Sequence, residues 1–173
     1  MKTVNQILDD VLKKEGWPTY TEHPNDRGGP TKGGITLRTL EAWRGRRCTR
    51  AELQRLKRVE AVAMLKRRYV ETNGINKIED EQLRAQVIDD AVLSGPMLAV
   101  KDLQRSIGSV DADGIIGPKT LAALASSDSH AVGLRLAVER SLRLCRHVVA
   151  NPDQGVFLVG WIKRSLSFVA PLI

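Results

Sequence analysis

The sequence has few cysteines and no long apolar segment. Cys48 and Cys145 lie 97 positions apart without CxxC spacing, which argues against a zinc site or thioredoxin chemistry. We expect two buried free thiols, with a long-range disulfide as the alternative. The longest apolar run, Val156 to Ile162, is much shorter than the ~20 residues of a membrane-spanning helix. No apolar run typical of a secretory signal follows the N-terminus. The sequence therefore predicts synthesis in a cytoplasm and no stable membrane insertion.

Signals for metals, cofactors and nucleic acid are also missing. No His, Asp and Glu cluster has metal-ligand spacing, and no glycine-rich loop between a strand and a helix suggests phosphate binding. A net charge of +7 favours encounters with polyanions, which include nucleic acid and acidic cell-wall polymer. Because basic residues do not alternate with aromatic ones and no recognition helix is evident, we expect no nucleic-acid partner, no cofactor and no metal.

Apolar periodicity predicts a mainly α protein with a small β-hairpin or loop element near the N-terminus. A first helix is indicated by apolar residues at helical spacing from Val4 to Leu12, and Thr3 with Gln6 forms a capping box. Gly16 and Pro18 end this helix. The glycine- and proline-rich stretch up to Thr36 predicts a loop with short strands.

Further helices are expected along the rest of the chain. Helices are expected to begin after Thr36, after Thr49 (a second capping box with Glu52) and at Pro118, and a break is expected near Arg58. Other helices are expected at about 80–94, 97–107, 129–149 and 156–168.

Two carboxylates near the N-terminus have the arrangement that glycosidic cleavage needs. That reaction requires a carboxylic acid kept protonated by partial burial and a second, ionised carboxylate in a polar setting. Glu15 follows the apolar stripe of the first helix and precedes Trp17, which predicts an apolar wall beside it. Asp26 lies among turn residues. On spacing alone, a solvated helix end and a turn-forming aspartate explain the same two residues.

The surrounding motifs resemble glycoside hydrolase family 108, lysozyme-like N-acetylmuramidases of phages and bacteria. The family signature reads E-G-G-Y-x-N-D-P-x-D-P-G-G-x-T-K-Y-G-I-T, and residues 15–36 follow it in order. Later matches follow the family's R-Y-W, D-x-A-V-N-S-G, L-Q…D-G-x-x-G-P-x-T-L and G-W-x-N-R motifs; they lie at Arg68-Tyr69, 89–95, 103–121 and 160–164. The resemblance covers almost the whole chain.

The resemblance implies a lysozyme-like, two-lobed α-helical fold and a set of site residues. Glu15 takes the position of the general acid, and Asp26, Thr31 and Thr36 match the other catalytic positions. The substrate contacts implied are Tyr20, Glu22, Gly34 and Asp89. Because Glu22-His23 stands where the family has N-D, Glu22 is also a competing second carboxylate. The chain departs from the family pattern at several positions: Trp17-Pro18-Thr19 for a single Gly, Glu22-His23 for N-D, Arg27 for Pro, Gly33 for Tyr and Leu93 for Asn.

We therefore expect a catalytic region at 1–95 and a C-terminal peptidoglycan-binding-type lobe at 96–173. The implied activity is an N-acetylmuramidase that hydrolyses the β-1,4 bond between N-acetylmuramic acid and N-acetylglucosamine. A lytic transglycosylase and a non-catalytic peptidoglycan-binding protein are the alternatives. We further expect a monomeric, bacteriolytic, antimicrobial phage endolysin. It would reside in the host cytoplasm before lysis and then act in the periplasm on the cell wall.

Overall fold

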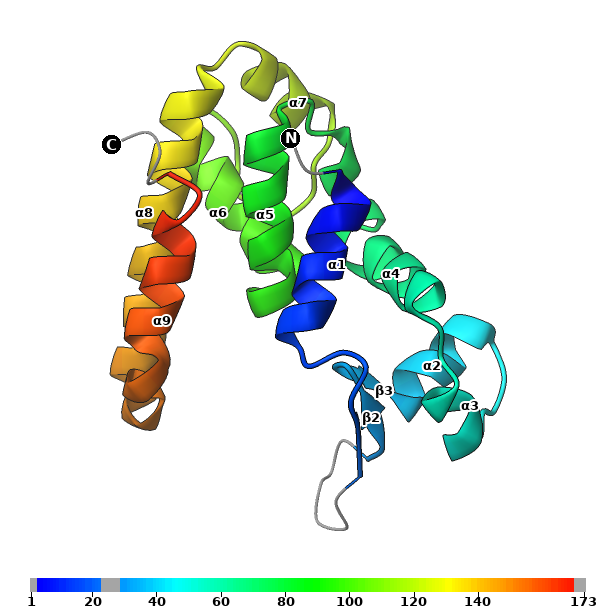
Figure 1. Ribbon diagram of the computed structural model, residues 1–173. Helices are drawn as coiled ribbons and strands as arrows, with labels where there is room; N and C mark the ends of the chain where they lie inside the picture. Colours follow the sequence, from blue (N-terminus) through cyan, green and yellow to red (C-terminus); the bar gives the residue numbers. More distant parts are fainter. Residues whose placement is uncertain (1–2, 23–28, 170–173) are drawn as a thin grey trace. The chain divides into compact units, whose positions relative to one another are not determined.

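The computed structural model describes residues 3–22 and 29–169. The chain divides into two compact units, which we call the N-terminal unit (residues 2–68) and the C-terminal unit (residues 69–173). Helices dominate both units, and a small antiparallel sheet lies in the N-terminal one (Figure 1). The predicted fold class, mainly α with a small β element near the N-terminus, is confirmed.

The N-terminal unit consists of short helices around a three-stranded sheet. Its elements are α1 (Val4–Lys14), β1 (Tyr20–Thr21), β2 (Thr31–Lys32), β3 (Ile35–Thr36), α2 (Leu37–Arg44), α3 (Arg50–Gln54) and α4 (Arg58–Lys66), and a π-helical turn, η1 (Arg67–Glu71), directly follows α4. Both predicted capping boxes are present, Thr3 with Gln6 on α1 and Thr49 with Glu52 on α3. The expected break near Arg58 separates α3 from α4.

A small apolar core holds the N-terminal unit together. It contains buried side chains from α1, β3, α2, α3 and α4; these are Leu12, Ile35, Leu40, Leu53, Leu56, Ala61 and Met64. Helix α1 packs on α4 through its apolar stripe. The Arg44 guanidinium also ties α2 to α4, because its Nε and Nη2 each donate to Glu60 at 2.9 Å. The end of α1 and the start of α2 are therefore anchored on one core.

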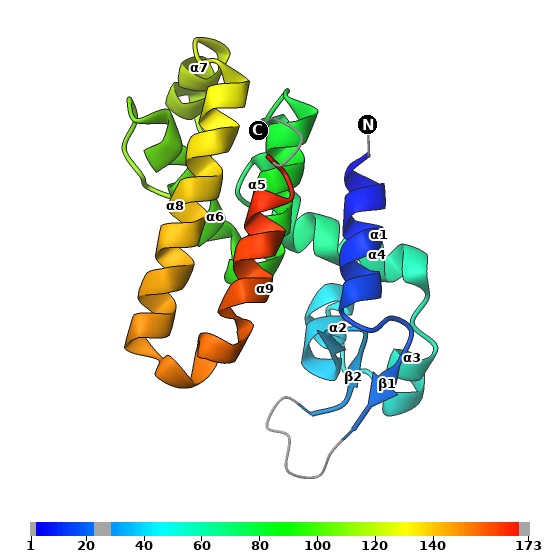
Figure 2. The ribbon, with the colours of Figure 1, turned by 60° about the vertical axis from the view of Figure 1, so that its left-hand side comes forward.

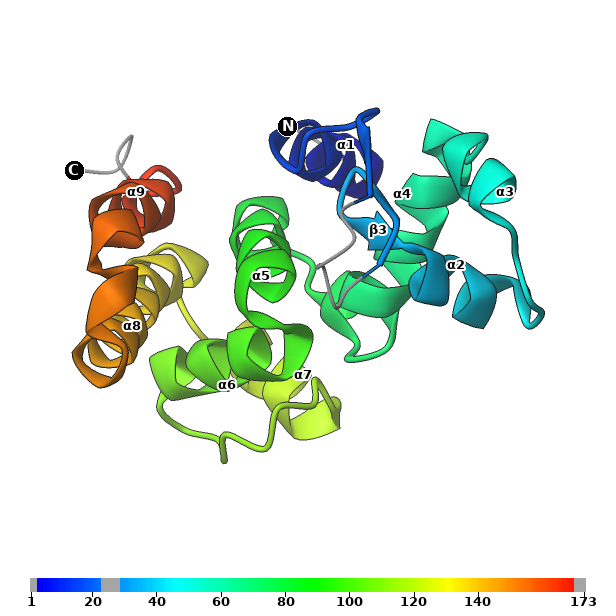
Figure 3. The ribbon, with the colours of Figure 1, turned by 90° about the horizontal axis from the view of Figure 1, so that it is seen from below.

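The C-terminal unit is a helical bundle. Its elements are η2 (Ile75–Lys77), α5 (Glu81–Ser94), α6 (Pro96–Ile107), α7 (Pro118–Ala125), α8 (Ser129–Ala150), η3 (Pro152–Gln154) and α9 (Gly155–Leu166). Helix α6 packs between α5 and α8, and α8 and α9 form an antiparallel pair joined through η3 (Figures 2 and 3). Gly95 alone separates α5 from α6, because Pro96 is already the first residue of α6.

The buried centre of this bundle is ionic as well as apolar. Asp89, Asp90 and Asp102 are buried, and so is Arg140, whose side chain has 0% exposure. Arg140 Nη2 lies 3.0 Å from Asp89 Oδ2, and Arg143 bridges Asp90 and Asp102 at 2.7 and 2.6 Å. Four helices, α5, α6, α8 and α9, share this network, because Arg164 of α9 also binds Asp89.

Both cysteines are free thiols, as predicted, but the prediction that they are buried is wrong. Cys48 is half-buried beside α3, whereas Cys145 is exposed on α8. A long helix such as α8 presents every side of its cylinder in turn, so a small apolar residue can lie on the solvent side. Within the described ranges, no helix is both long enough and apolar enough to span a membrane.

Candidate active site

The end of α1 presents Glu15 to solvent. The Glu15 N–H still donates to Val11 O at 2.9 Å, whereas Gly16 adopts a φ of +79° and the Trp17 N–H turns back to Leu12 O at 3.0 Å. Glycine accepts a positive φ without a steric penalty, so the helix stops sharply at this point. Glu15 is exposed instead of partly buried, which corrects the expectation of an apolar wall beside it.

The turn between β2 and β3 lies directly against the Glu15 side chain. A Cβ built on Gly34 would lie 3.4 Å from Glu15 Cβ and 3.6 Å from Glu15 Oε2. Gly34 also has a φ of +77°, which a residue with a side chain rarely adopts. The structure thus brings two predicted site residues together. The positive φ of Gly34 is what requires a glycine there, since an added Cβ would be at ordinary contact distance from Glu15.

The departures at Trp17 and Gly33 are coupled. A Cβ on Gly33 would lie only 2.6 Å from Trp17 Cε3, so the indole occupies the space that a side chain at position 33 would need. Lys32 Nζ lies 5.0 Å from the centre of the Trp17 ring and donates to Leu56 O at 3.0 Å. These contacts hold Trp17 toward the core. With Trp17 in this place, position 33 has no room for the tyrosine of the family pattern.

The sheet aligns three threonines. Thr31 pairs with Thr21 on β1 and with Thr36 on β3, while Lys32 pairs with Tyr20 and Ile35. Directly paired residues point to the same face of a sheet, so Thr21, Thr31 and Thr36 form a threonine row on one face. Ile35 on the opposite face is buried in the core. The sequence indicated Thr31 and Thr36 but missed Thr21, whose place depends on a register that strands of two residues do not reveal.

Hydrogen bonding distinguishes the two predicted catalytic threonines. Thr36 Oγ1 accepts from Thr39 N at 3.1 Å as the N-cap of α2 and also bonds Thr39 Oγ1 at 2.9 Å. Thr31 Oγ1 donates to Gly29 O at 3.1 Å, which leaves its lone pairs available. Thr31 is therefore better equipped to accept a hydrogen bond from a bound water, and Thr36 mainly fixes the start of α2.

Glu22 is held in a local ion pair. Its Oε2 accepts from the Tyr20 hydroxyl at 2.7 Å, and its Oε1 accepts from Arg50 Nε at 2.6 Å. The hydrogen bond from Tyr20, together with that from Arg50, lowers the pKa of the Glu22 carboxyl. The same bond raises the pKa of the Tyr20 hydroxyl. Both predicted substrate contacts are thus engaged with each other, and Arg50, their partner on α3, was not recognised from the sequence.

Two predicted carboxylate residues remain. Asp26 falls outside the described residues. Asp89 belongs to the C-terminal unit, where it is 3% exposed and binds Arg140 and Arg164. A carboxylate with this burial and these partners is structural in the conformation described, which argues against the substrate contact predicted for Asp89. Its two arginine partners lie 51 and 75 positions away in the sequence, so no local sequence pattern could predict these ion pairs.

The turn at Asp113-Gly114 also has a structural role. Gln104 Nε2 donates to Asp113 Oδ1 at 2.7 Å, and the Gly114 N–H donates to Gln104 Oε1 at 2.8 Å. Gly114 has a φ of +87°, and a Cβ there would lie 2.8 Å from Met97 Cγ. The glycine is therefore required by the turn and by its contact with α6.

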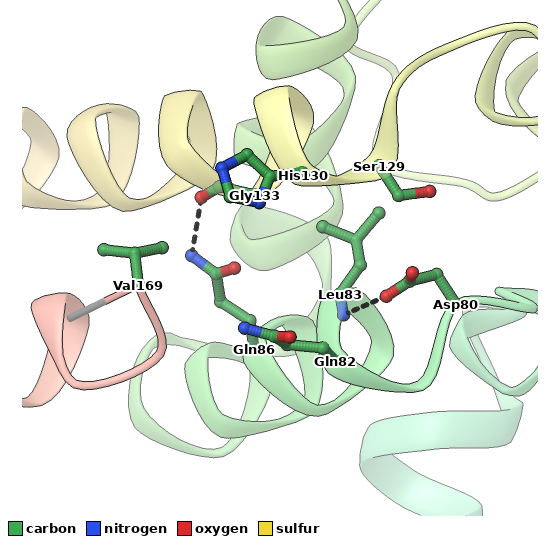
Figure 4. Close-up of a pocket in the computed structure, with 8 residues that line it drawn as sticks. All are labelled: Asp80, Gln82, Leu83, Gln86, Ser129, His130, Gly133 and Val169. Atoms are coloured by element: carbon green, nitrogen blue, oxygen red, sulfur yellow. Dashed lines mark hydrogen bonds between the residues drawn. The ribbon is translucent and has the colours of Figure 1, made fainter. Parts of the chain in front are cut away.

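A small hollow in the C-terminal unit is lined by residues from α5, α8 and the segment after α9 (Figure 4). Gln86 Nε2 crosses it to donate to Gly133 O at 3.1 Å. Its volume of about 90 Å³ suits a few water molecules and is well below that of a ligand pocket. We therefore do not assign it a saccharide. Across residues 3–22 and 29–169, no group of three or more His, Cys, Asp or Glu side chains is placed to hold a metal ion.

Comparison with known proteins decides the family. Residues 8–95 match the model of glycosyl hydrolase 108, and residues 98–166 match that of a predicted peptidoglycan domain. The chain belongs to glycosyl hydrolase family 108. It is also similar to a solved structure described as the structure of Brucella abortus SagA, with 31% sequence identity and a TM-score of 0.69 over 95% of this chain and 94% of that one. No curated protein sequence matches the chain.

This membership confirms the predicted enzyme class. The family 108 protein is a lysozyme-like glycoside hydrolase that acts on peptidoglycan, with a peptidoglycan domain after its hydrolase region. The family models divide the chain between residues 95 and 98, whereas the packing divides it between residues 68 and 69. The functional assignment of regions 1–95 and 96–173 stays a prediction.

Proposed function

We propose that this enzyme is an N-acetylmuramidase that hydrolyses the β-1,4 bond between N-acetylmuramic acid and N-acetylglucosamine. The observation that carries the proposal is the position of Glu15. Its carboxyl group is exposed at the end of a helix anchored in the core and lies against the Gly34 turn. A fixed but accessible acid suits protonation of a glycosidic oxygen, because the geometry is set before the substrate arrives.

In this proposal Glu15 donates its proton to the leaving glycosidic oxygen as the C–O bond breaks. A water molecule then adds to the anomeric carbon, and its proton passes to the second carboxylate. Asp26 takes that second role by its match to the family signature, with Thr31 accepting a hydrogen bond from the water. Glu22 is less suited, because Tyr20 and Arg50 occupy both of its oxygens. A bound sugar would cover Glu15 and exclude solvent from it.

Mass spectrometry of the fragments released from purified peptidoglycan tests this chemistry. We expect fragments with reducing-end muramic acid from the wild type and far fewer from Glu15→Gln. Anhydro-muramic ends would instead identify a lytic transglycosylase, which needs no second carboxylate. Reducing ends on glucosamine would move the cleavage to the other glycosidic bond. Peptidoglycan binding without fragments would identify a non-catalytic binding protein.

We further propose that the enzyme is a monomeric phage endolysin that accumulates in the host cytoplasm and lyses the cell after reaching the wall. The support is the family's phage members and the net charge of +7, which favours contact with an acidic polymer. Addition of the pure protein to membrane-permeabilised cells tests the lytic role, and light scattering tests the monomer. Loss of turbidity only after permeabilisation is expected; a lack of lysis in permeabilised cells would contradict it.

A further inference from the structure

A groove in the N-terminal unit lies beside the candidate active site. It is formed by one side of α2, by α4 and by the start of η1, and its lining residues are Arg38, Thr39, Ala42, Trp43, Met64, Arg67 and Arg68. Its volume is about 450 Å³, which falls within the usual range of ligand pockets, roughly 300–1,000 Å³. It is the size of a site for one sugar unit with a substituent.

The groove combines an apolar platform with positive charge. Trp43 is 37% exposed, while Met64 beneath the groove is buried. An indole face packs well against the C–H face of a pyranose ring, because both surfaces are flat and apolar. Among the residues that the structure describes, the lining includes three guanidinium groups and no carboxylate. Arginine binds carboxylates through a planar pair of N–H donors, so the groove favours a sugar that bears acidic groups.

Arg38 is the arginine best placed for such a ligand. It is exposed on the first turn of α2, and no carboxylate is paired with it among the residues that the structure places. Arg44, six residues later on α2, shows the contrast, because Glu60 engages its guanidinium and raises its pKa. A guanidinium with no carboxylate partner in the described part of the chain, in the same groove as an exposed tryptophan, suits an acidic ligand.

The groove is linked to the threonine row through Thr39. Thr39 lines the groove, and its backbone N–H and hydroxyl both bond Thr36 Oγ1, at 3.1 and 2.9 Å. Thr36 is the last residue of β3 and pairs with Thr31. A glycan strand that crosses the threonine row therefore meets the groove at the first turn of α2.

We propose that this groove binds a muramic acid unit that carries its peptide stem. The sugar ring lies on Trp43, and the carboxylates of the peptide stem lie at Arg38 and the neighbouring arginines. The inference rests on the proposed function, because it assigns the groove to the same substrate, and it adds recognition of the peptide to cleavage of the glycan.

Calorimetric titration with two soluble probes tests this assignment. One probe is a disaccharide–peptide fragment of peptidoglycan, and the other is the same disaccharide after removal of its peptide. In a Glu15→Gln background, Trp43→Ala is expected to weaken binding of both probes by about tenfold. Arg38→Gln is expected to weaken only the peptide-bearing probe, by roughly threefold to tenfold. Trp43→Phe should retain most of the affinity, which separates loss of the ring from loss of folding.

Arg47→Gln is the matched control, because it removes one exposed positive charge from the same unit outside the groove. If Arg38→Gln and Arg47→Gln weakened binding equally, net charge alone would explain the effect of Arg38, and the inference would be overturned. Wild-type affinity in both groove variants, or preferential binding of anionic lipid vesicles by the groove residues, would also overturn it. Failure of the proposed function would give a different result. The wild-type enzyme, with Glu15 intact, would release no fragments from peptidoglycan, whatever the groove variants bind.

Discussion

The two units of this enzyme use carboxylates in opposite ways. In the N-terminal unit, Glu15 lies exposed at a helix end, and Glu22 and Glu52 form ion pairs near the surface. In the C-terminal unit, Asp89, Asp90 and Asp102 are buried among arginines that join four helices. An acid must be accessible to act on a substrate, whereas a buried pair acts only on the fold. The contrast supports the proposal that the chemistry lies in the N-terminal unit, although both units carry motifs of the family.

The largest expected effect concerns the second carboxylate. Asp26→Asn should lower kcat/KM on peptidoglycan by roughly 10²- to 10⁴-fold, because an ionised carboxylate that activates water is lost. Glu22→Gln should lower it less than about threefold, because that carboxylate serves Arg50 and Tyr20. Both variants replace a carboxylate by the amide of the same size, so their initial rates of peptidoglycan cleavage can be compared directly. A larger loss in Glu22→Gln would reverse the assignment.

The next effect concerns the buried network. Asp89 pairs with both the fully buried Arg140 and the partly buried Arg164, so Asp89→Ala removes a carboxylate partner from each. Loss of one partner of a buried ion pair costs about 3–5 kcal/mol of folding free energy. Urea unfolding followed by circular dichroism measures this loss. A change below about 1 kcal/mol would show that the network does not stabilise the C-terminal unit.

A smaller effect is expected at Gly33. Gly33→Ala places a methyl group against Trp17 at a φ of +51°, which should cost about 1–3 kcal/mol. Gly45→Ala is a control, since Gly45 also has a positive φ but no atom within 4 Å of an added Cβ. Thermal unfolding should therefore show a larger decrease for Gly33→Ala than for Gly45→Ala. Equal decreases would mean that the indole moves aside.

The smallest expected effect is a difference between the two units in how their stability depends on pH. The hydrogen bonds from Arg46 and Thr49 lower the pKa of Glu52 to about 2, so its stabilising contribution is complete above its ordinary pKa of 4.5 and is lost as pH falls toward 2. Burial raises the pKa of Asp102, so its contribution is complete below its ordinary pKa of 3.8 and is lost as pH rises through the raised value.

Acid should therefore weaken the N-terminal unit first. Trp17 and Trp43 report on that unit and Trp161 on the other, so single-tryptophan variants followed by fluorescence between pH 5 and about 2 distinguish them. An acid transition that begins at Trp161 would contradict the comparison.

Local signals explain which parts of the fold the sequence could predict. Thr3 with Gln6 and Thr49 with Glu52 carry their capping information within four residues, and both helix starts are confirmed. The threonine row could not be seen, because its strands are two residues long and their register depends on the Gly33-Gly34 turn. Family motifs indicated Glu15 and Gly34, which the structure brings into contact. They also indicated Asp89, whose buried ion pairs depend on arginines distant in the sequence.

The most direct test measures two variants in two assays. Glu15→Gln and Asp89→Asn are both carboxyl-to-amide changes, one in each unit, and each is assayed for peptidoglycan cleavage and for unfolding free energy. The expected result is a rate loss of about 10²-fold or more with unchanged stability for Glu15→Gln. Asp89→Asn should lose stability and keep the wild-type rate per folded molecule. A Glu15→Gln enzyme that cleaves at the wild-type rate would contradict the central claim.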